Sequence, residues 1–477
     1  MSRSTAETST AACSPRSTQS RKSWTKSSFM AFPPGRPGGA GFPWNGLGTH
    51  PASAATTRTG NGNAFRSFLP RPMHPSPHEP PPRVAPQGPR PPRLRAVIAI
   101  PARDEAARLP DCLSALARQQ DSGGLAVLVL ANNCRDDTAA VARALAPGLP
   151  FRLEVREATL DSSLSHAGGA RRAAMEAAAD LLAAEADPRR AVLLSTDADG
   201  RAEPGWLDAN LAALAAGADA VAGAIAADPA EAALLPPALR RQEAQEAHYA
   251  ALLDEMAALV DPDPHDPWPR HAAHSGASIA LTLAAYRRVG GPPAVPVGED
   301  RALFEALIRA DMRVRHCPAA RVVVSCRLDG RAAGGMADTL RRRLAEAGAA
   351  PLDASLEPAL NALLRLRCRR ALRRLRAGQP RLGDPVRLAL ALGMAPSTLA
   401  EIVRLPRFWS AWEGLQARAL PLRHRRPLRA SAVGVEIDRA TALLGGLRGA
   451  RALVSPRRLP EGRAAGPAGS DRRATAA

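Results

Sequence analysis

The sequence predicts an α/β protein in which a mostly parallel sheet is covered by helices. From Leu94 onward, short apolar runs of β type alternate with stretches of helical periodicity. This alternation is typical of parallel strands joined by crossover helices. The predicted strands are 96–100, 125–131, 151–155, 191–196 and 218–225, and the predicted helices are about 105–120, 136–146, 168–187 and 203–216.

Changes of composition divide the chain into four predicted regions. The 477 residues include 45 prolines and 37 glycines, so part of the chain is not expected to form a packed core. The predicted regions are a disordered Pro/Ser/Arg-rich tail over 1–93, the α/β domain over 94–335, a Leu/Ala/Arg-rich helical region over 336–455 and a disordered tail over 456–477.

A net charge of +19 would normally indicate nucleic acid or an anionic membrane as a partner. Much of this charge precedes residue 96, in a segment whose acidic residues are Glu7 and Glu79, and every basic residue after Lys26 is arginine, which resembles a GC-rich coding bias. We therefore expect no nucleic-acid partner. The basic helix 364–376 leaves a peripheral membrane contact open.

The sequence favours a cytoplasmic protein, with a peripheral place at the inner face of the membrane left open. No apolar run approaches the roughly 18–20 residues that span a bilayer, and the first thirty residues lack a signal-peptide hydrophobic region. The six cysteines show neither zinc-site spacing nor a disulfide framework.

Polar residues follow the first two predicted strands, where ligands bind in sheets of this kind. Pro101, Arg103 and Glu105 follow the first strand, and Asn132 and Asp136 follow the second. Carboxylate and amide groups there can hold a base or a ribose. Helix capping and a charged first helical turn explain the same residues, and capping is compatible with ligand contact.

Asp197 and Asp199 carry the strongest chemical signal because they directly follow the predicted strand 191–196. Two carboxylates so close together repel each other unless a cation or ligand offsets their charge. A hard divalent cation, completed by diphosphate oxygens and water, is the expected partner. Position carries this argument, since Asp261 and Asp263 form the same triplet in a proline-rich loop with no strand before it.

Two further motifs open predicted helices. In Gly168–Arg172, the glycines allow a close backbone approach and Arg171 adds a contact to an anion, although a turn is the more common explanation for paired glycines. In Gly298-Glu299-Asp300, a carboxylate could face the cleft and take a proton from a hydroxyl. The alternative is that both carboxylates are charges at a helix N-terminus.

The order of these motifs resembles the family 2 glycosyltransferases. The similarity extends over about 94–330 and consists of PARDE, NNCRDDT, GGARR, STDADG, GASIALTLAAYRRVGG and GED in that order. The resemblance implies a GT-A fold, a nucleotide-diphosphate sugar donor, Mg²⁺ or Mn²⁺ as cofactor, and inversion at the anomeric carbon.

The resemblance also implies roles for individual residues. Pro101–Glu105 and 132–137 would line the nucleotide pocket, Asp199 would be the principal metal ligand, Asp197 would contact ribose or metal-bound water, and Asp300 would be the catalytic base. The QxxRW motif and membrane helices of the processive synthases are missing from this sequence, which favours a non-processive enzyme. Lipid, small-molecule and polysaccharide acceptors remain open.

Two features depart from the family pattern or extend it. Ala131 and Asn132 stand where many relatives carry an acidic pair, which puts the usual carboxylate contact to uracil in doubt. Arg327 and Arg331, after the strand RVVV, could reach the diphosphate, although surface arginines are equally expected in this chain.

Three other interpretations compete with the transferase. A nucleotidyltransferase should show a glycine-rich basic loop after its first strand, which PARDE does not resemble. A basic protein that binds nucleic acid or an anionic membrane would account for the charge. A degenerate GT-A scaffold would account for the altered residues at 131 and 132.

Overall fold

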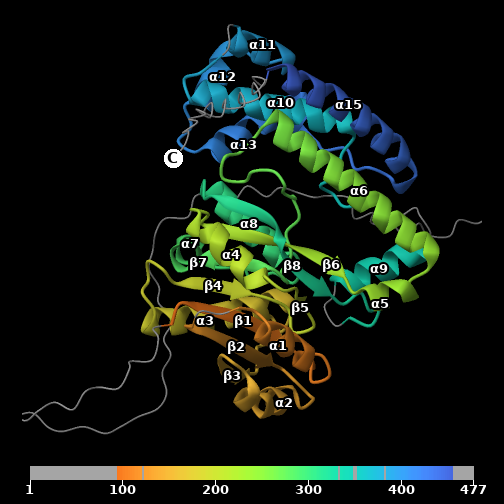
Figure 1. The fold of residues 1–477 in the computed structure, drawn as a ribbon. Coiled ribbons are helices and arrows are strands. Elements are labelled where there is room, and N and C mark those ends of the chain that lie inside the picture. The colour runs from red at the N-terminus through yellow and green to blue at the C-terminus, as the bar shows by residue number, and fades with distance from the viewer. Residues whose placement is uncertain (1–93, 121–122, 331–333, 347–351, 381–382, 455–477) are drawn as a thin grey trace, which may run out of the picture. The chain divides into compact units, whose positions relative to one another are not determined.

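An eight-stranded mixed sheet is the framework of the part of the chain that the computed structural model describes (Figure 1). The structure describes residues 94–454 except 121–122, 331–333, 347–351 and 381–382. The two predicted disordered tails, 1–93 and 456–477, therefore lie outside the described residues.

The strand order is β3-β2-β1-β4-β7-β6-β8-β5, and every predicted strand is present. The pairs β1–β2, β2–β3, β1–β4 and β6–β8 are parallel, whereas β7 is antiparallel to β4 and β6, and β5 to β8. The sheet is thus parallel in its first half and mixed in its second. The strands are β1 (Ala96–Ala102), β2 (Leu125–Asn132), β3 (Arg152–Ala158), β4 (Val192–Ser195), β5 (Arg201–Ala202), β6 (Ala220–Ala227), β7 (Ile279–Thr282) and β8 (Val314–Val324).

Helices cover both faces of the sheet because strand side chains alternate in direction. Ile98 and Ile100 of β1 pack with Leu113 of α1 and Trp206 of α4, whereas Val97 packs on the opposite side among residues of α3 and α8. The helices of this part are α1 (Leu109–Ala117), α2 (Thr138–Leu145), α3 (Ala167–Glu185), α4 (Trp206–Ala215), α5 (Pro229–Leu234), α6 (Pro237–Val260), α7 (Leu283–Val289) and α8 (Glu299–Arg309).

The described residues after 335 form helices and no strand, as predicted. Of these helices, α10 and α15 pack onto α6 (Figure 1). Tyr249 and Met256 of α6 share a buried core with Leu363 and Leu444. The helices are α9 (Met336–Ala345), α10 (Ala359–Arg376), α11 (Asp384–Ala391), α12 (Pro396–Val403), α13 (Phe408–Arg418), α14 (Leu420–Arg423) and α15 (Val433–Val454). The predicted domain boundary at 335 stays a prediction.

The arginines of α10 take part in ion pairs inside the protein. Arg365 is buried and its Nε lies 2.9 Å from Glu357 Oε1, and Arg369 Nε lies 2.5 Å from the buried Asp261 Oδ2. Arg373 Nε lies 3.2 Å from Asp261 Oδ1. The Asp261 triplet therefore has a structural role, and these arginines offer less charge to an external partner than the sequence suggests.

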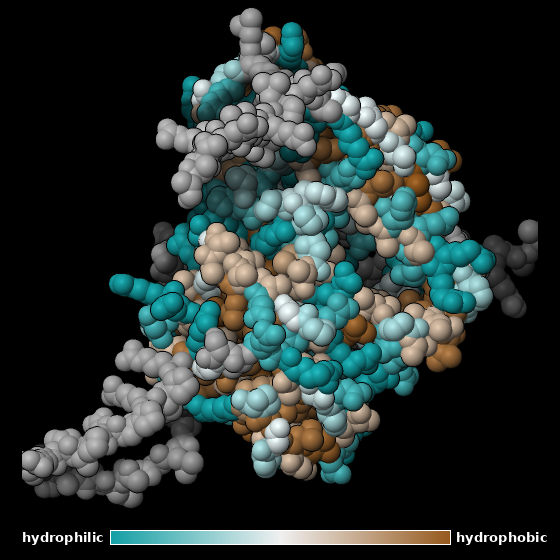
Figure 2. Space-filling model, viewed as in Figure 1, coloured by the Kyte–Doolittle hydropathy of each residue, from teal (hydrophilic) through white to brown (hydrophobic). Residues whose placement is uncertain are grey.

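Two observations bear on the predicted membrane contact. Among the described residues, no single helix is long and apolar enough to cross a membrane. The helices 385–391 and 396–403, which meet at a bend, together have the length and apolar composition of a membrane span, and no other observation supports one. Leu390 and Leu420 are each 75% exposed, and hydrophobic and hydrophilic residues are interspersed on the face shown in Figure 2. A peripheral contact stays a prediction.

Candidate active site

Three carboxylates meet at the carboxyl ends of β1 and β4, where the sequence places a cation. Asp197 and Asp199 follow β4, and the turn that carries them is closed by a 3.0 Å hydrogen bond from Gly200 N to Asp197 O. Glu105 comes from the loop after β1. Arg327, after β8, lies with its Nη2 2.9 Å from Glu105 Oε1 and 3.3 Å from Asp199 Oδ2.

The electrostatics of Asp199 reflect this crowding. Burial, followed by the negative charges of Asp197 and Glu105, raises the pKa of Asp199 from 3.8 to about 6, although Arg327 and Arg108 oppose the shift. A carboxylate in this state gains from any cation that approaches it. The cluster therefore contains oxygen donors of the type that Mg²⁺ and Mn²⁺ prefer, held in an environment that favours positive charge.

Arg171 connects this cluster to the GED motif. Its guanidinium is 6% exposed and donates to Asp197 Oδ1 at 2.6 Å and to Glu299 Oε1 at 2.9 Å. It also donates to Ser195 Oγ at 3.0 Å and to Gly276 O at 2.8 Å. Burial lowers the pKa of Arg171, but the charges of Asp197 and Glu299 outweigh burial and raise it overall. Arg171 is thus a buried bridge, and its predicted contact with a ligand stays a prediction.

Asp300 occupies the first turn of α8, beside the buried Glu299. Gly298, with φ of 77°, begins the helix in the left-handed conformation that glycine adopts readily. Asp300 Oδ2 accepts a hydrogen bond from Gly276 N at 2.8 Å, and Oδ1 accepts one from Arg301 N at 2.7 Å. Gly276 therefore contacts both Asp300 and Arg171, and joins the predicted base to the carboxylates after β4.

The loops after β1 and β2 are tied together by the residues predicted to line a nucleotide pocket. Asp136 Oδ2 accepts a hydrogen bond from Ala106 N at 3.0 Å, and Thr138 Oγ1 accepts one from Glu105 N at 2.9 Å. Arg103 Nη1 donates to Ser165 O at 3.0 Å on the surface. Asp136 therefore has the capping and loop-closing role that was the alternative interpretation, which is compatible with ligand contact.

Asn132, at the end of β2, is 2% exposed, and its Oδ1 has no hydrogen-bond partner among the described residues. A buried amide oxygen without a donor is uncommon because it loses its hydrogen bond to water. Pro101 lies on the neighbouring strand β1, paired in register with Leu130. The predicted pocket residues are thus brought to one edge of the sheet.

Sequence reasoning missed several residues of this site. Glu299 had no predicted partner, although it is the buried partner of Arg171. Gly276 and His274 lie within or beside a quoted motif but had no predicted role. Their contacts join segments more than 20 residues apart, so no local pattern could reveal them. Arg331 lies outside the described residues.

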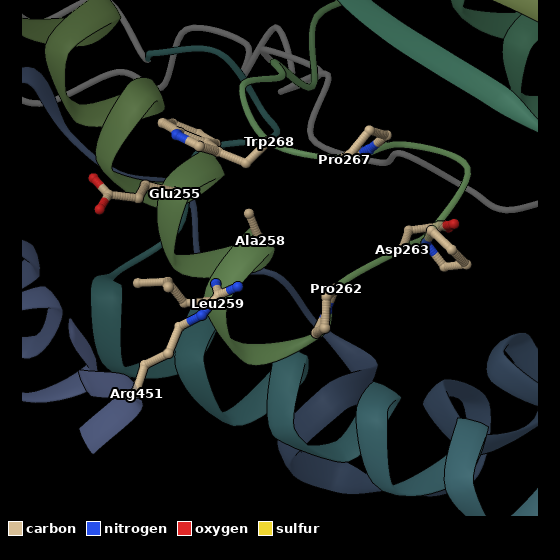
Figure 3. A pocket seen from close by; sticks show the side chains of 9 residues that line it. Glu255, Ala258, Leu259, Pro262, Asp263, Pro267, Trp268 and Arg451 are labelled. Carbon is tan, nitrogen blue, oxygen red and sulfur yellow. The ribbon is translucent and has the colours of Figure 1, made fainter. Parts of the chain in front are cut away.

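A separate cavity of about 610 Å³ lies between the end of α6 and the loop 261–268. Figure 3 shows Glu255 and Leu259 on α6, Trp268 on the loop and Arg451 on α15. None of the predicted site residues lines this cavity. The carboxylate cluster, and not this cavity, is therefore the candidate active site.

The comparison with protein families agrees with the geometry. Residues 97–263 match the family described as glycosyl transferase family 2. The chain contains a family 2 glycosyltransferase domain. The matched part of this glycosyltransferase domain includes Asp197 and Asp199, whereas Asp300 and Arg327 lie beyond it. A search of curated proteins found no match.

Solved structures of glycosyltransferases resemble the chain at low similarity. TarS 1-349 from S. aureus, in complex with UDP-GlcNAc, is 14% identical with a TM-score of 0.38, covering 75% of this chain and 92% of TarS 1-349. Mannosyltransferase PcManGT from Pyrobaculum calidifontis, in complex with GDP-Man and Mn²⁺, is 18% identical with a TM-score of 0.36, covering 77% and 82%. The glucosyl-3-phosphoglycerate synthase from Mycobacterium tuberculosis is 19% identical with a TM-score of 0.31, covering 53% and 78%. Because these TM-scores are low, the assignment to the glycosyltransferases rests on the family match and the site geometry.

Proposed function

We propose that this glycosyltransferase moves a sugar from a nucleotide-diphosphate donor to an acceptor hydroxyl, with inversion and with Mg²⁺ or Mn²⁺ at Asp199. The observation that carries the proposal is the cluster of Asp197, Asp199 and Glu105 at the carboxyl ends of β1 and β4, inside a family 2 domain. That edge of an α/β sheet is where nucleotides bind.

The residues present fit a divalent cation. Asp199 and Asp197 offer hard oxygen ligands. Burial, followed by the negative charges of Asp197 and Glu105, raises the pKa of Asp199, and a bound cation would stabilise its ionised form. When bound, such a cation neutralises diphosphate charge and stabilises the leaving nucleoside diphosphate. Arg327 adds a fixed positive charge at the same place, which suits it to the diphosphate oxygens.

Asp300 supplies the base in this proposal. Its carboxylate accepts the proton of the acceptor hydroxyl as the oxygen forms a bond to the anomeric carbon, and the bond from that carbon to the diphosphate oxygen breaks. The electron pair of the broken bond leaves with the nucleoside diphosphate. Gly276 N–H fixes one carboxylate oxygen of Asp300, so the group is oriented before the acceptor arrives.

The nucleotide pocket is proposed at Pro101, Arg103, Glu105, Asn132 and Asp136. The free acceptor on Asn132 Oδ1 supports a hydrogen bond from the donor's base. Asn132 would then take the place of the acidic side chain that many relatives carry there. Binding of this kind is compatible with the loop-closing contacts of Asp136.

The test is metal-dependent stabilisation of the full chain by a panel of nucleotide-diphosphate sugars. Ligand at about 100 times its dissociation constant adds roughly 2.7 kcal/mol to the free energy of unfolding. We expect one donor to raise the melting temperature with Mg²⁺ or Mn²⁺, and Asp199→Ala to abolish the effect. Asp180→Ala, at an exposed position on α3, is the matched control and should retain it. If no nucleotide sugar binds with either cation, the proposal is wrong and the scaffold interpretation takes its place.

A further inference from the structure

Three histidines gather beside the candidate base, outside the carboxylate cluster. His271 and His274 belong to the loop before β7, and His316 belongs to β8. The Nε2 atoms of His274 and His316 are 3.1 Å apart. The ring of His271 meets that of His316 edge-on, with centroids 5.7 Å apart.

A buried aspartate determines the proton positions in this group. Asp266 is 4% exposed, and its Oδ2 lies 2.8 Å from His316 Nδ1 and 2.6 Å from Arg270 Nη1. Its Oδ1 accepts from Arg315 Nη1 at 3.0 Å and from His316 N at 2.9 Å. Burial raises the pKa of Asp266, but the hydrogen bond and charge of His316 and the charge of Arg270 outweigh burial and hold it at about 2. Asp266 is therefore ionised, and His316 Nδ1–H donates to it.

His316 also contacts the second histidine. Its Nδ1–H donates to Asp266, so its Nε2 is the atom that pairs with His274 Nε2 across the 3.1 Å contact, and the proton of that hydrogen bond is carried by one of these two nitrogens. Burial, followed by the charges of His316 and His271, lowers the pKa of His274 to about 3, which keeps it neutral. A chain of hydrogen bonds therefore links His274 through His316 to Asp266.

This chain of hydrogen bonds ends on the segment that holds Asp300. His274 stacks on Phe304 of α8, with ring centroids 4.6 Å apart and an interplanar angle of 13°. Two residues later, Gly276 donates its N–H to Asp300 and accepts from Arg171 with its carbonyl. A Cβ added to Gly276 would lie 2.3 Å from Arg171 Nη2, so the backbone there lies directly against the Arg171 guanidinium.

We propose that Asp266, His316 and His274 form a positioning relay that fixes the 274–276 segment and thereby orients the Asp300 carboxylate toward the acceptor. The relay residues act through Gly276 and are not catalytic themselves. The inference rests on the proposed role of Asp300, but the hydrogen-bond chain is testable without any activity.

The first experiment measures the tautomers. Nitrogen-15 NMR of the histidine side chains in the full chain, at neutral pH, should show a proton on His316 Nδ1 and a neutral His274. Asp266→Asn should change the His316 signal and leave that of the exposed His248 unchanged. If His316 Nδ1 carries no proton in the wild type, the relay is wrong, whatever the activity.

The second experiment separates positioning from folding and from donor binding. His274→Leu should lower kcat about 10- to 100-fold, the loss expected when a reacting group is misplaced by about 1 Å, while the KM for the donor and the metal-dependent stabilisation stay unchanged. His274→Gln keeps a hydrogen-bonding group that can face His316 and should recover most of the rate. His248→Asn is the control.

The outcomes distinguish this inference from the proposed function. If the wild type transfers sugar and His274→Leu has the same kcat as His248→Asn, the relay is overturned while the function stands. If wild type shows no transfer but the tautomers are as stated, the proposed function is wrong and the hydrogen-bond chain remains a structural element of the loop.

Discussion

Replacing Arg171 by methionine removes the buried link between Asp197 and Glu299. Methionine has a similar length and no charge, so the change deletes four hydrogen bonds while filling most of the space. The carboxylate of Glu299, whose side chain is 8% exposed, is left buried without its cation. Asp197 is 35% exposed, so water replaces part of what it loses.

The size of the effect follows from these exposures. Removing one partner of a buried ion pair destabilises a protein by about 3–5 kcal/mol, because the remaining charge is uncompensated. Arg171→Met should therefore lower the free energy of unfolding by about that amount. Arg171→Met combined with Glu299→Gln removes the buried charge and should recover roughly half of the loss, since Gly276 O and Ser195 Oγ still lack a donor.

Urea unfolding followed by tryptophan fluorescence measures this change. Arg172→Met is the matched control, because the neighbouring guanidinium is 42% exposed and donates to Pro292 O at the surface. We expect the control to change stability by less than about 1 kcal/mol. An Arg171→Met variant no less stable than Arg172→Met would refute the view that Arg171 is a structural bridge.

Three further changes test other parts of the structure. Burial raises the pKa of Asp254 from 3.8 to about 7. The folded protein thus binds this proton more tightly than the unfolded chain, and the associated stability is present below pH 4 and lost as pH rises through 7. Asp254→Asn should remove that loss, so the variant should be more stable than wild type by a few kcal/mol at pH 8 in urea titrations, and an unchanged pH dependence would contradict the assignment. Asp311→Ala removes the acceptor for Phe408 N and Trp409 N at the start of α13 and should lower stability by about 1 kcal/mol, whereas Asp311→Asn should lose less. Gly276→Ala places a methyl group against Arg171. It should lower the free energy of unfolding by about 1–3 kcal/mol and thus the melting temperature. Gly148→Ala, with open space around the added methyl group, should leave the melting temperature unchanged.

The parallel half of the sheet could be predicted because its strands are continuous apolar runs. Ile98, Ile100 and Val127 sit in runs that are buried on both faces, and such runs have one plausible structure when helices alternate with them. The same pattern placed Asp197 and Asp199 at a strand end, and that placement is confirmed.

The mixed half of the sheet was harder to predict. β7 has four residues and leads directly into α7 at Leu283, so its apolar residues look like the start of that helix. Its antiparallel direction also depends on the path of the whole segment after β6. Local periodicity carries neither kind of information.

Long-range pairing explains the remaining differences. Arg171 and Glu299 are 128 positions apart, and His274 and His316 are 42 apart. Arg365 looked like part of an exposed basic helix, but it is buried beside Glu357. The sequence shows which residues carry charge, whereas only the fold shows which of those charges neutralise each other.

The most direct test of the proposed site is to locate the cation. Crystals of the full chain grown with Mn²⁺ and a nucleoside diphosphate should give an anomalous Mn²⁺ peak roughly 2 Å from a carboxylate oxygen of Asp199, with the diphosphate beside it and the base near Asn132. A peak elsewhere, or a nucleotide in the cavity beside α6, would contradict the account of how this glycosyltransferase binds its donor.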